Sequence, residues 1–369
     1  MPTVTFFPLG NADSSLITLE NGKRLLFDFG NEGDPADAND LRIDLAKAVR
    51  DDLLGAKRSH IDVVAVSHLD RDHLAGSTEF FWLEHATKYQ GEGRIKIAEL
   101  WVPAAAIVDD QCEDEAKILQ AEARHRLKSG KDIKVFSRPD MLKDWLANQG
   151  LSVQDRLSCI VDAGTLVPTC SLAQDGVEIF VHSPFGQRLN DKEVIDRNKD
   201  AIMVQATFVV EGVETKLLFG SDIPWEHLKE IVEVTRAHQR DSRLEWDIFH
   251  LPHHCSYLSL SDEKGDEMTS PDPEIAWLYE SQSRKGAILI SPSWPIPSED
   301  TDLPPHRQAA AYYRSAARNV AGEFMVTMEY PSTARPKPIV IKIDRTKAFV
   351  SRPSYGAPAI VSSTAHRAG

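Results

Sequence analysis

The sequence predicts an α/β protein in which groups of β-strands alternate with amphipathic helices. Short apolar runs rich in β-branched residues, such as 61–66, are typical of buried strands. Apolar residues at helical spacing recur between such runs, as in 41–53. Because a helix and a sheet each bury an apolar face against another element, this alternation indicates a layered α/β domain.

The composition is that of a globular protein. With 369 residues, 42% of them hydrophobic and 27% charged, the chain can bury a substantial core in one large or two smaller domains. No apolar run approaches the roughly 18 residues of a membrane span, and the N-terminus lacks a basic-then-apolar signal sequence. We therefore expect a cytoplasmic protein without a membrane partner.

Cysteine usage and net charge indicate the compartment of the protein and the partners that it can bind. The cysteines Cys112, Cys159, Cys170 and Cys255 form no CxxC pair and are expected to be free thiols in a reducing compartment. A net charge of -14 argues against non-specific adhesion to nucleic acid or to anionic membranes. It does not exclude a nucleic-acid substrate, because metal ions and a local basic patch can bind phosphate.

The first part of the chain is predicted to form three strands, a helix and a fourth strand. The strands are expected at 3–8, 16–20, 24–28 and 61–66, and the helix at 41–53. Asn21-Gly22 is a strong hairpin signal between the second and third strands, and Gly55 is a plausible end for the helix.

The pattern after residue 73 is less regular. Helices are expected at 76–84, 113–127, 141–146, after Pro224, and at 306–317; strands are expected at 95–102, 177–182, 201–210, 214–219, 246–251, 287–291, 324–328 and 338–343. Residues from about 80 to 175 contain no metal-binding motif and are interpreted as a partly helical insertion or cap. Residues 1–345 are then one catalytic domain, and 346–369 are a loosely held tail.

Four metal-capable side chains follow the predicted strand 61–66 within six residues. His68, Asp70 and Asp72 alternate along an extended or turning backbone, so they can converge on one point, and His73 follows directly at the expected start of a helix. Two imidazoles and two carboxylates so close together suit one or two divalent cations. The alternative is a polar loop whose charges face water.

Polar residues also follow other predicted strands. Asp222 lies at a strand-to-helix junction, where an aspartate is often only an N-cap. The adjacent pair His253 and His254 follows another strand, where packing alone explains it poorly. By spacing alone, Asp13 and Asp28 are turn formers.

One cationic stretch runs through the predicted insertion. It comprises Arg124, Arg126, Lys128, Lys131, Lys134 and Arg138. Such a run is usually a solvated helix face, and the alternative is a phosphate-binding surface. Arg124 and Arg126 are therefore kept as candidate substrate-binding residues.

Taken in order, these motifs resemble the metallo-β-lactamase fold. The resemblance is strongest to the hydrolase domain of the competence protein ComEC and its stand-alone relatives, and it covers most of 1–345 outside the insertion. Its elements are the loop Gly10-Asn11-Ala12-Asp13-Ser14, Asp28-Phe29-Gly30, the HxDxDH box at 68–73 with its aspartate at 70, Gly220-Ser221-Asp222, Pro252-His253-His254-Cys255-Ser256 and His306.

The resemblance implies an αββα four-layer sandwich with two mixed sheets face to face and a dinuclear metal site at one edge. His68 and Asp70 would hold one metal; Asp72, His73 and His254 would hold the other, and Asp222 would bridge them. His253 could replace His254 as the ligand, a choice that the sequence leaves open. The metals would be zinc or manganese, with magnesium as a further option, because Asp70 in place of an imidazole makes its site harder.

The chain departs from the family pattern in two places. Cys255 stands where the family usually has glycine, and a thiol there could lie near the metals. The Asn-rich turn before the hairpin is only partly present at 198–200, and the histidine that many relatives have there is absent, which leaves Asp200 as a substitute ligand. The candidate substrate-binding residues of these loops are Asp13, Ser14, Asn198, Asp200 and Ser256.

The implied activity is hydrolysis by a metal-bound hydroxide, with Asp70 and Asp72 at the catalytic centre. Phosphodiesters are the expected substrates, in a nucleic acid or a nucleotide. A lactone, thioester or β-lactam hydrolase of the same fold is the first alternative, because one fold accommodates many substrates. The second is a non-catalytic scaffold bound to protein partners in a larger assembly.

His306 is a further candidate catalytic residue. It precedes a predicted helix, so we expect it in the first helical turn, where free N–H groups favour an anion such as a phosphate. It would protonate the leaving oxygen or hold the phosphate. As a general acid, its replacement by alanine should lower turnover about a hundredfold to ten-thousandfold.

Overall fold

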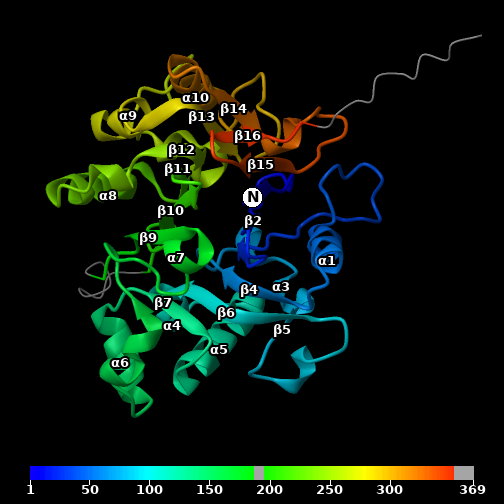
Figure 1. Ribbon diagram of the computed structural model, residues 1–369, viewed down its shortest axis with the longest axis vertical. Coiled ribbons are helices and arrows are strands. Elements are labelled where there is room, and N and C mark those ends of the chain that lie inside the picture. The colour runs from blue at the N-terminus through cyan, green and yellow to red at the C-terminus, as the bar shows by residue number, and fades with distance from the viewer. Residues whose placement is uncertain (187–194, 353–369) are drawn as a thin grey trace, which may run out of the picture.

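The computed structural model describes residues 1–186 and 195–352. Two β-sheets carry the fold (Figure 1). The strands of the first are β1 (Thr3–Phe6), β2 (Ser15–Thr18), β3 (Arg24–Phe27), β4 (His60–Ala65), β5 (Phe81–Trp82), β6 (Ile95–Pro103), β7 (Ile133–Phe136), β8 (Ile160–Val161), β15 (Ile339–Ile343) and β16 (Ala348–Val350). Those of the second are β9 (Val177–Ser183), β10 (Met203–Val210), β11 (Val213–Phe219), β12 (Trp246–His250), β13 (Ser283–Ser291) and β14 (Glu323–Val326).

Both sheets are mixed. The first has the order β16-β15-β1-β2-β3-β4-β6-β7-β8, with β5 beside β6, and is antiparallel up to β3 and parallel from β3 onward. The second has the order β14-β13-β12-β11-β10-β9 and is parallel from β11 to β14. The helices are α1 (Leu45–Gly55), α2 (Arg71–Leu74), α3 (Ser77–Phe80), α4 (Ala104–Val108), α5 (Asp114–Ser129), α6 (Asp140–Asn148), α7 (Leu172–Asp175), α8 (Trp225–Ala237), α9 (Pro273–Glu280) and α10 (Arg307–Asn319).

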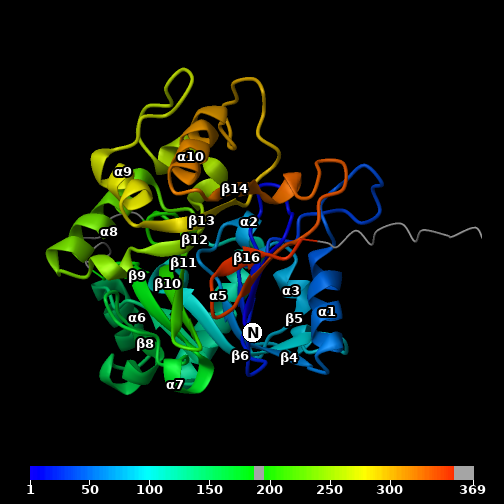
Figure 2. The same cartoon turned by 45° about the horizontal axis from the view of Figure 1, so that its top comes forward.

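Three apolar cores define four layers. One lies between the first sheet and helices α1, α3, α4, α5 and α6, a second lies between the two sheets, and a third lies between the second sheet and helices α8, α9 and α10. The two helical layers therefore lie on opposite sides of the paired sheets, as the turned view also shows (Figure 2). This arrangement confirms the predicted αββα sandwich.

The strand β4 shows why the sequence forms this architecture. Its side chains alternate between cores: Ile61 and Val64 pack under the helices, whereas Val63 and Ala65 pack between the sheets. A segment buried on both faces needs apolar residues at successive positions, which explains the apolar run from Val63 to Val66, whereas Asp62 before it is only partly buried. The same alternation places Leu218 of β11 against the helices and Leu217 between the sheets.

The interpretation of 80–175 as an insertion or cap is wrong. The strands β6, β7 and β8 continue the first sheet in parallel beside β4, and helices α4, α5 and α6 cover its outer face. The apolar alternation of β6 and the short length of β7 and β8 hid this continuity. The helix expected at 76–84 is also shorter, because α3 ends at Phe80 and β5 follows at once.

The end of the chain differs from the prediction in part. β16 pairs with β15, so the first sheet extends past residue 345. The rest of the predicted tail, 353–369, lies outside the described residues. Across 1–186 and 195–352, each helix is too short or too polar to traverse a lipid bilayer.

Candidate metal centre

The ends of four parallel strands converge at one edge of the sandwich. Asp28 follows β3 and the segment 68–73 follows its parallel neighbour β4, while Asp222 follows β11 and His254 follows its parallel neighbour β12. Parallel neighbours end at the same edge of a sheet, where open α/β proteins bind their ligands. The polar residues that end the strands are thereby brought together.

A four-residue cluster forms at this edge. Asp72, His73, Asp222 and His254 each offer one donor atom, and these atoms all lie within 4.8 Å of one another. His254 Nε2 lies 3.1 Å from Asp72 Oδ2 and 3.6 Å from Asp222 Oδ2, and His73 Nε2 lies 3.4 Å from Asp222 Oδ1. Three of the four are buried, and Asp72 reaches toward solvent.

Three histidines present the same ring nitrogen to this site. His73 Nδ1–H donates to Asp28 Oδ2 at 2.9 Å, and His254 Nδ1–H donates to the Pro292 carbonyl at 2.8 Å. The Ser67 hydroxyl donates to Asp28, so its oxygen accepts from His68 Nδ1–H at 3.0 Å. Each ring is thus held at Nδ1 and directs Nε2 toward the carboxylates of the site, where His254 Nε2 lies within hydrogen-bond distance of Asp72; this orientation is found for histidines that ligate metals.

Several buried atoms of the site have no hydrogen-bond partner. Among the described residues, His68 Nε2, His73 Nε2 and Asp222 Oδ1 are buried and unsatisfied. An unpaired buried polar group is costly, and imidazole and carboxylate donors at this spacing suit a divalent cation. The residues present therefore fit a metal ion, which Asp72, His73, Asp222 and His254 would hold.

The electrostatics of the site also suit a cation. Burial opposes the charged forms, yet His254 and His73 hold the pKa of Asp222 well below its usual value, and His73 and His254 lower the pKa of Asp72 to about 2. Although burial alone would lower the pKa of His254, Asp222 and Asp72 raise it to about 9. Protons on the rings thus balance the carboxylates, and a divalent cation would replace them. Burial and the charge of His73 instead lower the pKa of His68.

Two loops predicted to be turns brace the cluster. Asp28 holds His73 and also accepts from the backbone N–H of Ser67 at 2.7 Å. Asp13 is buried against His250, whose Nε2 lies 3.1 Å from Asp13 Oδ1, and the Asp13 N–H donates to the Asp72 carbonyl at 2.9 Å. The turn-former interpretation of Asp13 and Asp28 is therefore incomplete, because both support the metal-binding loop.

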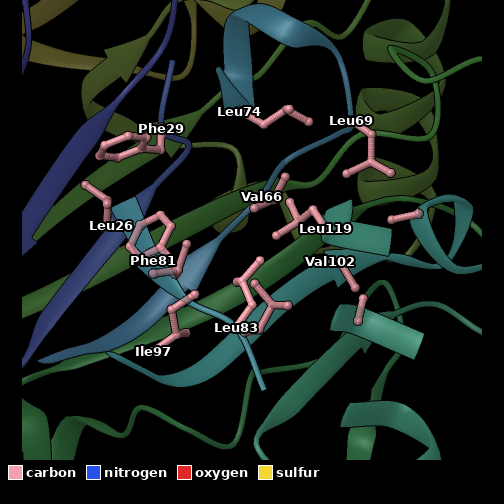
Figure 3. Close-up of a cluster of buried hydrophobic side chains, with 14 of the residues drawn as sticks. Leu26, Phe29, Val66, Leu69, Leu74, Phe81, Leu83, Ile97, Val102 and Leu119 are labelled. Atoms are coloured by element: carbon pink, nitrogen blue, oxygen red, sulfur yellow. The ribbon is translucent and has the colours of Figure 1, made fainter. Parts of the chain in front are cut away.

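The α2 segment is held by backbone contacts as well. A Cβ on Gly30 would lie 1.9 Å from the Asp72 carbonyl oxygen, so only glycine permits this approach. On the other side, Leu69 and Leu74 anchor the segment in the core beneath α5 (Figure 3). The ligand loop is therefore fixed before any metal binds.

Backbone strain is concentrated around the same site. Asp28 and Ser221 have φ of 58° and 48°, and the consecutive residues His253, His254 and Cys255 have φ of 49°, 52° and 66°. Non-glycine residues in this region cost on the order of 1 kcal/mol or more each and cluster at functional sites. The left-handed φ of Cys255 also explains why glycine, which the resembling family usually has at this position, would fit there without strain.

The structure distinguishes the two adjacent histidines. His254 joins the cluster, whereas His253 does not, and Nδ1 of His253 has no hydrogen-bond partner among the described residues. Cys255 points away from the site into the core beneath α10, and burial raises the pKa of its thiol to about 12. The idea that this thiol lies near the metals is therefore wrong.

The remaining predicted ligands form a second group beside the cluster. Asp70 Oδ2 lies 3.6 Å from His68 Nε2, and Asp70 Oδ1 accepts from Arg197 Nη1 at 3.0 Å. Arg197 was not singled out in the sequence, although it lies directly before the partly matched turn at 198–200. Together with Asp70 and Asn198 it lines an open cavity of about 840 Å³.

Several predicted substrate contacts are buried supports instead. Ser14 donates to the Asp28 carbonyl at 3.0 Å, and Ser256 accepts from the Leu258 N–H at 3.2 Å. Asp200 is buried and accepts from the Asp196 N–H at 3.3 Å, outside the four-residue cluster. The contacts of Ser14, Ser256 and Asp200 are therefore structural, as are those of Asp13, whereas Asn198 lies on the cavity wall.

The cationic stretch does not form a continuous phosphate-binding surface. Arg126 is fully buried and pairs with Glu122 at 2.7 Å, so its assignment as a substrate-binding residue is wrong. Arg124 is half-buried and donates through Nε to the Ile107 carbonyl at 2.7 Å. Arg126 lies on the face of α5 that packs against the first sheet, where it donates to the Ile97 carbonyl of β6, whereas Arg124 lies about 200° away around the helix and contacts α4.

His306 caps a helix rather than lying in its first turn. It is the residue before α10, buried, with its N–H donating to the Cys255 carbonyl at 3.1 Å. The Tyr257 N–H donates to its Nδ1, and its Nε2–H donates to the Asp302 carbonyl, both at 3.4 Å. Both ring nitrogens are therefore engaged by the protein backbone.

Comparisons with known proteins find similarity only to solved structures, at low sequence identity. No family model and no curated protein matches the sequence. Among solved structures, a diphosphatase of the PhnP family is 10% identical over 93% of this chain and 98% of that chain, with a TM-score of 0.36. The metallo-β-lactamase GOB-18 from Elizabethkingia meningoseptica is 12% identical over 73% of this chain and 83% of that chain, with a TM-score of 0.33. The fold assignment rests on the sheet order and packed cores of this chain.

Proposed function

We propose that this protein is a metal-dependent hydrolase that cleaves phosphodiesters. One observation carries the proposal: buried Nε2 atoms of His73 and His254 converge with Asp72 and Asp222, and their donor atoms lie within 4.8 Å. A core that needed only stability would not leave His73 Nε2 and Asp222 Oδ1 buried without a hydrogen-bond partner, because each such atom costs on the order of 1–3 kcal/mol. The cluster is therefore interpreted as a site for a reacting metal rather than as packing.

The bound metals and the residues of the site would have different roles in hydrolysis. Bound divalent metals would supply Lewis-acid stabilisation and an activated water near neutral pH. Asp72 is the cluster member that reaches solvent, with 31% of its side chain exposed, so the substrate would enter beside it. Its pKa of about 2 keeps this carboxylate ionised, which lets it accept a hydrogen bond from the attacking water and orient it.

Two features favour phosphodiesters over lactones and β-lactams. The motif set of the chain resembles that of the ComEC-type hydrolase domain. The group formed by Asp70, Asp72 and Asp222 also makes the site rich in hard oxygen donors, which suit manganese or magnesium and their phosphate substrates. The substrate would be a nucleic acid or a nucleotide.

A substrate panel tests the proposal. The metal-free protein, reloaded with Mn²⁺ or Zn²⁺, should cleave at least one of single-stranded DNA, RNA or a cyclic dinucleotide, and a chelator should abolish the activity. A lactone and a chromogenic β-lactam should be turned over poorly or not at all. Efficient hydrolysis of the lactone or β-lactam without phosphodiester cleavage would contradict the proposal.

His306 should affect the rate without donating a proton. Burial lowers the pKa of its ring, and both ring nitrogens are already bonded to the backbone. We therefore expect His306→Ala to lower turnover by less than the hundredfold that a general acid contributes at least. The pH–rate profile should keep its shape, and His306→Gln should recover part of the loss. A selective loss of the alkaline limb in the alanine variant would instead identify His306 as the proton donor.

A further inference from the structure

We propose that Arg197 is a positioning residue that holds Asp70 as a ligand for a second metal ion beside His68. The inference deepens the proposed function and rests on it, because it requires that the four-residue cluster binds a first metal. It assigns a role to a residue that contacts neither the cluster nor the expected reacting atoms. The residues of the second site would be His68 and Asp70.

The two carboxylate oxygens of Asp70 contact different residues. Oδ1 accepts from Arg197 Nη1 at 3.0 Å, whereas Oδ2 faces His68 Nε2 at 3.6 Å. Two ligands that each lie 2.0–2.2 Å from one ion are about 3.0–3.5 Å apart, so the His68–Asp70 pair is close to ligating distance. His68 Nε2 is buried and lacks a hydrogen-bond partner among the described residues.

Arg197 is itself rigidly anchored. Its Nε and Nη2 both lie 2.9 Å from Asp109 Oδ2, and Asp109 is buried at the end of α4. The other oxygen of Asp109 accepts from the Gln111 N–H at 2.8 Å, which fixes the carboxylate. A guanidinium presents several donors in one plane, so it can bind two carboxylates in a set orientation.

Without this contact Asp70 would be free to rotate. Its side chain is 40% exposed, and Arg197 provides the hydrogen bond that orients it. A carboxylate held at one oxygen offers the other as a single, directed ligand. Partners that orient a ligand in this way typically contribute 10- to 100-fold to metal affinity.

The two metal sites should then fill in order. The first cluster has two imidazoles and two carboxylates, whereas the pair at His68 has one of each and shares its carboxylate with a cation. A site with fewer ligands and less uncompensated negative charge binds a divalent ion more weakly. The first metal should therefore bind tightly, and the second should depend on Arg197.

Titration of the metal-free protein with Co²⁺, followed by visible absorbance and calorimetry, tests this dependence. The wild-type protein should bind in two phases. In Arg197→Ala the first phase should be unchanged, which also shows that the variant is folded, and the second should weaken 10- to 100-fold. Arg197→Lys keeps the charge but has one ammonium instead of a fork, so it should recover only part of the affinity.

Arg71→Ala is the matched control. Arg71 lies between Asp70 and Asp72 in the chain, but its side chain is 84% exposed and contacts Glu32 at 3.3 Å instead. Arg71→Ala removes one positive charge, as Arg197→Ala does, but it leaves the hydrogen bond between Arg197 and Asp70 intact. Both phases of Co²⁺ binding should therefore remain. An unchanged or tighter second phase in Arg197→Ala, or a single phase in the wild type, would overturn the inference. Absence of any Co²⁺ binding would contradict the proposed function itself.

Discussion

Replacing His254 by alanine should remove the tightly bound metal and reduce phosphodiester hydrolysis to background. His254 Nε2 lies 3.1 Å from Asp72 Oδ2 and is one of four converging donors. Loss of a residue that only orients a ligand costs 10- to 100-fold in affinity, so loss of the ligand itself should cost more than about a hundredfold. Metal content per chain after dialysis, measured by elemental analysis, and the rate of phosphodiester cleavage report the two effects.

His253→Ala is the matched control for this variant. The two histidines are adjacent and both have a left-handed backbone, with φ of 49° and 52°, so the cost of placing alanine there is similar. His253 lies outside the four-residue cluster, and its alanine variant should keep the metal of that cluster. Retention of metal in His254→Ala together with its loss in His253→Ala would contradict the assignment.

Metal binding to the wild-type protein should also depend on pH in a defined direction. Although burial lowers it, the charges of Asp222 and Asp72 raise the pKa of His254 to about 9, so the ring is protonated at pH 7 in the metal-free protein. A metal can bind only after that proton leaves. The apparent affinity should therefore rise with pH until about pH 9, as calorimetric titration with a divalent metal at several pH values would show.

The second large effect is expected on stability, at Arg126. Arg126→Met should lower the free energy of unfolding by about 3–5 kcal/mol, because it leaves the fully buried carboxylate of Glu122 without its cation. Arg126 also donates to the Asp132 carbonyl at 3.0 Å, and that acceptor would keep only the Leu100 N–H. Urea unfolding of both proteins at one pH measures the difference.

Two further variants separate this effect from a loss of charge. Lys128→Ala removes an exposed cation from the same helix and should change the free energy of unfolding by less than about 0.5 kcal/mol. In Glu122→Gln/Arg126→Met the charge left by the single variant is neutralised, so part of the stability should return. A small loss of stability in Arg126→Met, combined with a raised KM for a nucleic-acid substrate, would instead support a phosphate-binding role.

The sequence alone was sufficient for most of the architecture and for the location of the candidate metal centre. Strands such as β4 and β11 were visible because their final residues, 63–65 and 217–219, are buried on both faces and are therefore apolar at each position. The box at 68–73 was visible because four metal-capable residues at one strand end have few structural uses. The αββα layers followed from the family resemblance and the alternation of strands and helices.

Only the tertiary structure decided how the side chains of the site are used. It places His254 rather than His253 in the four-residue cluster, sets Asp28 behind His73, and brings Arg197 to Asp70. Each of these contacts joins segments far apart in the chain, which local spacing does not encode. The same holds for Arg126, whose charge suggested solvent until the first sheet covered it. Residue type and spacing determine which groups can bind a metal, whereas the packing of distant strands determines which of their atoms face it.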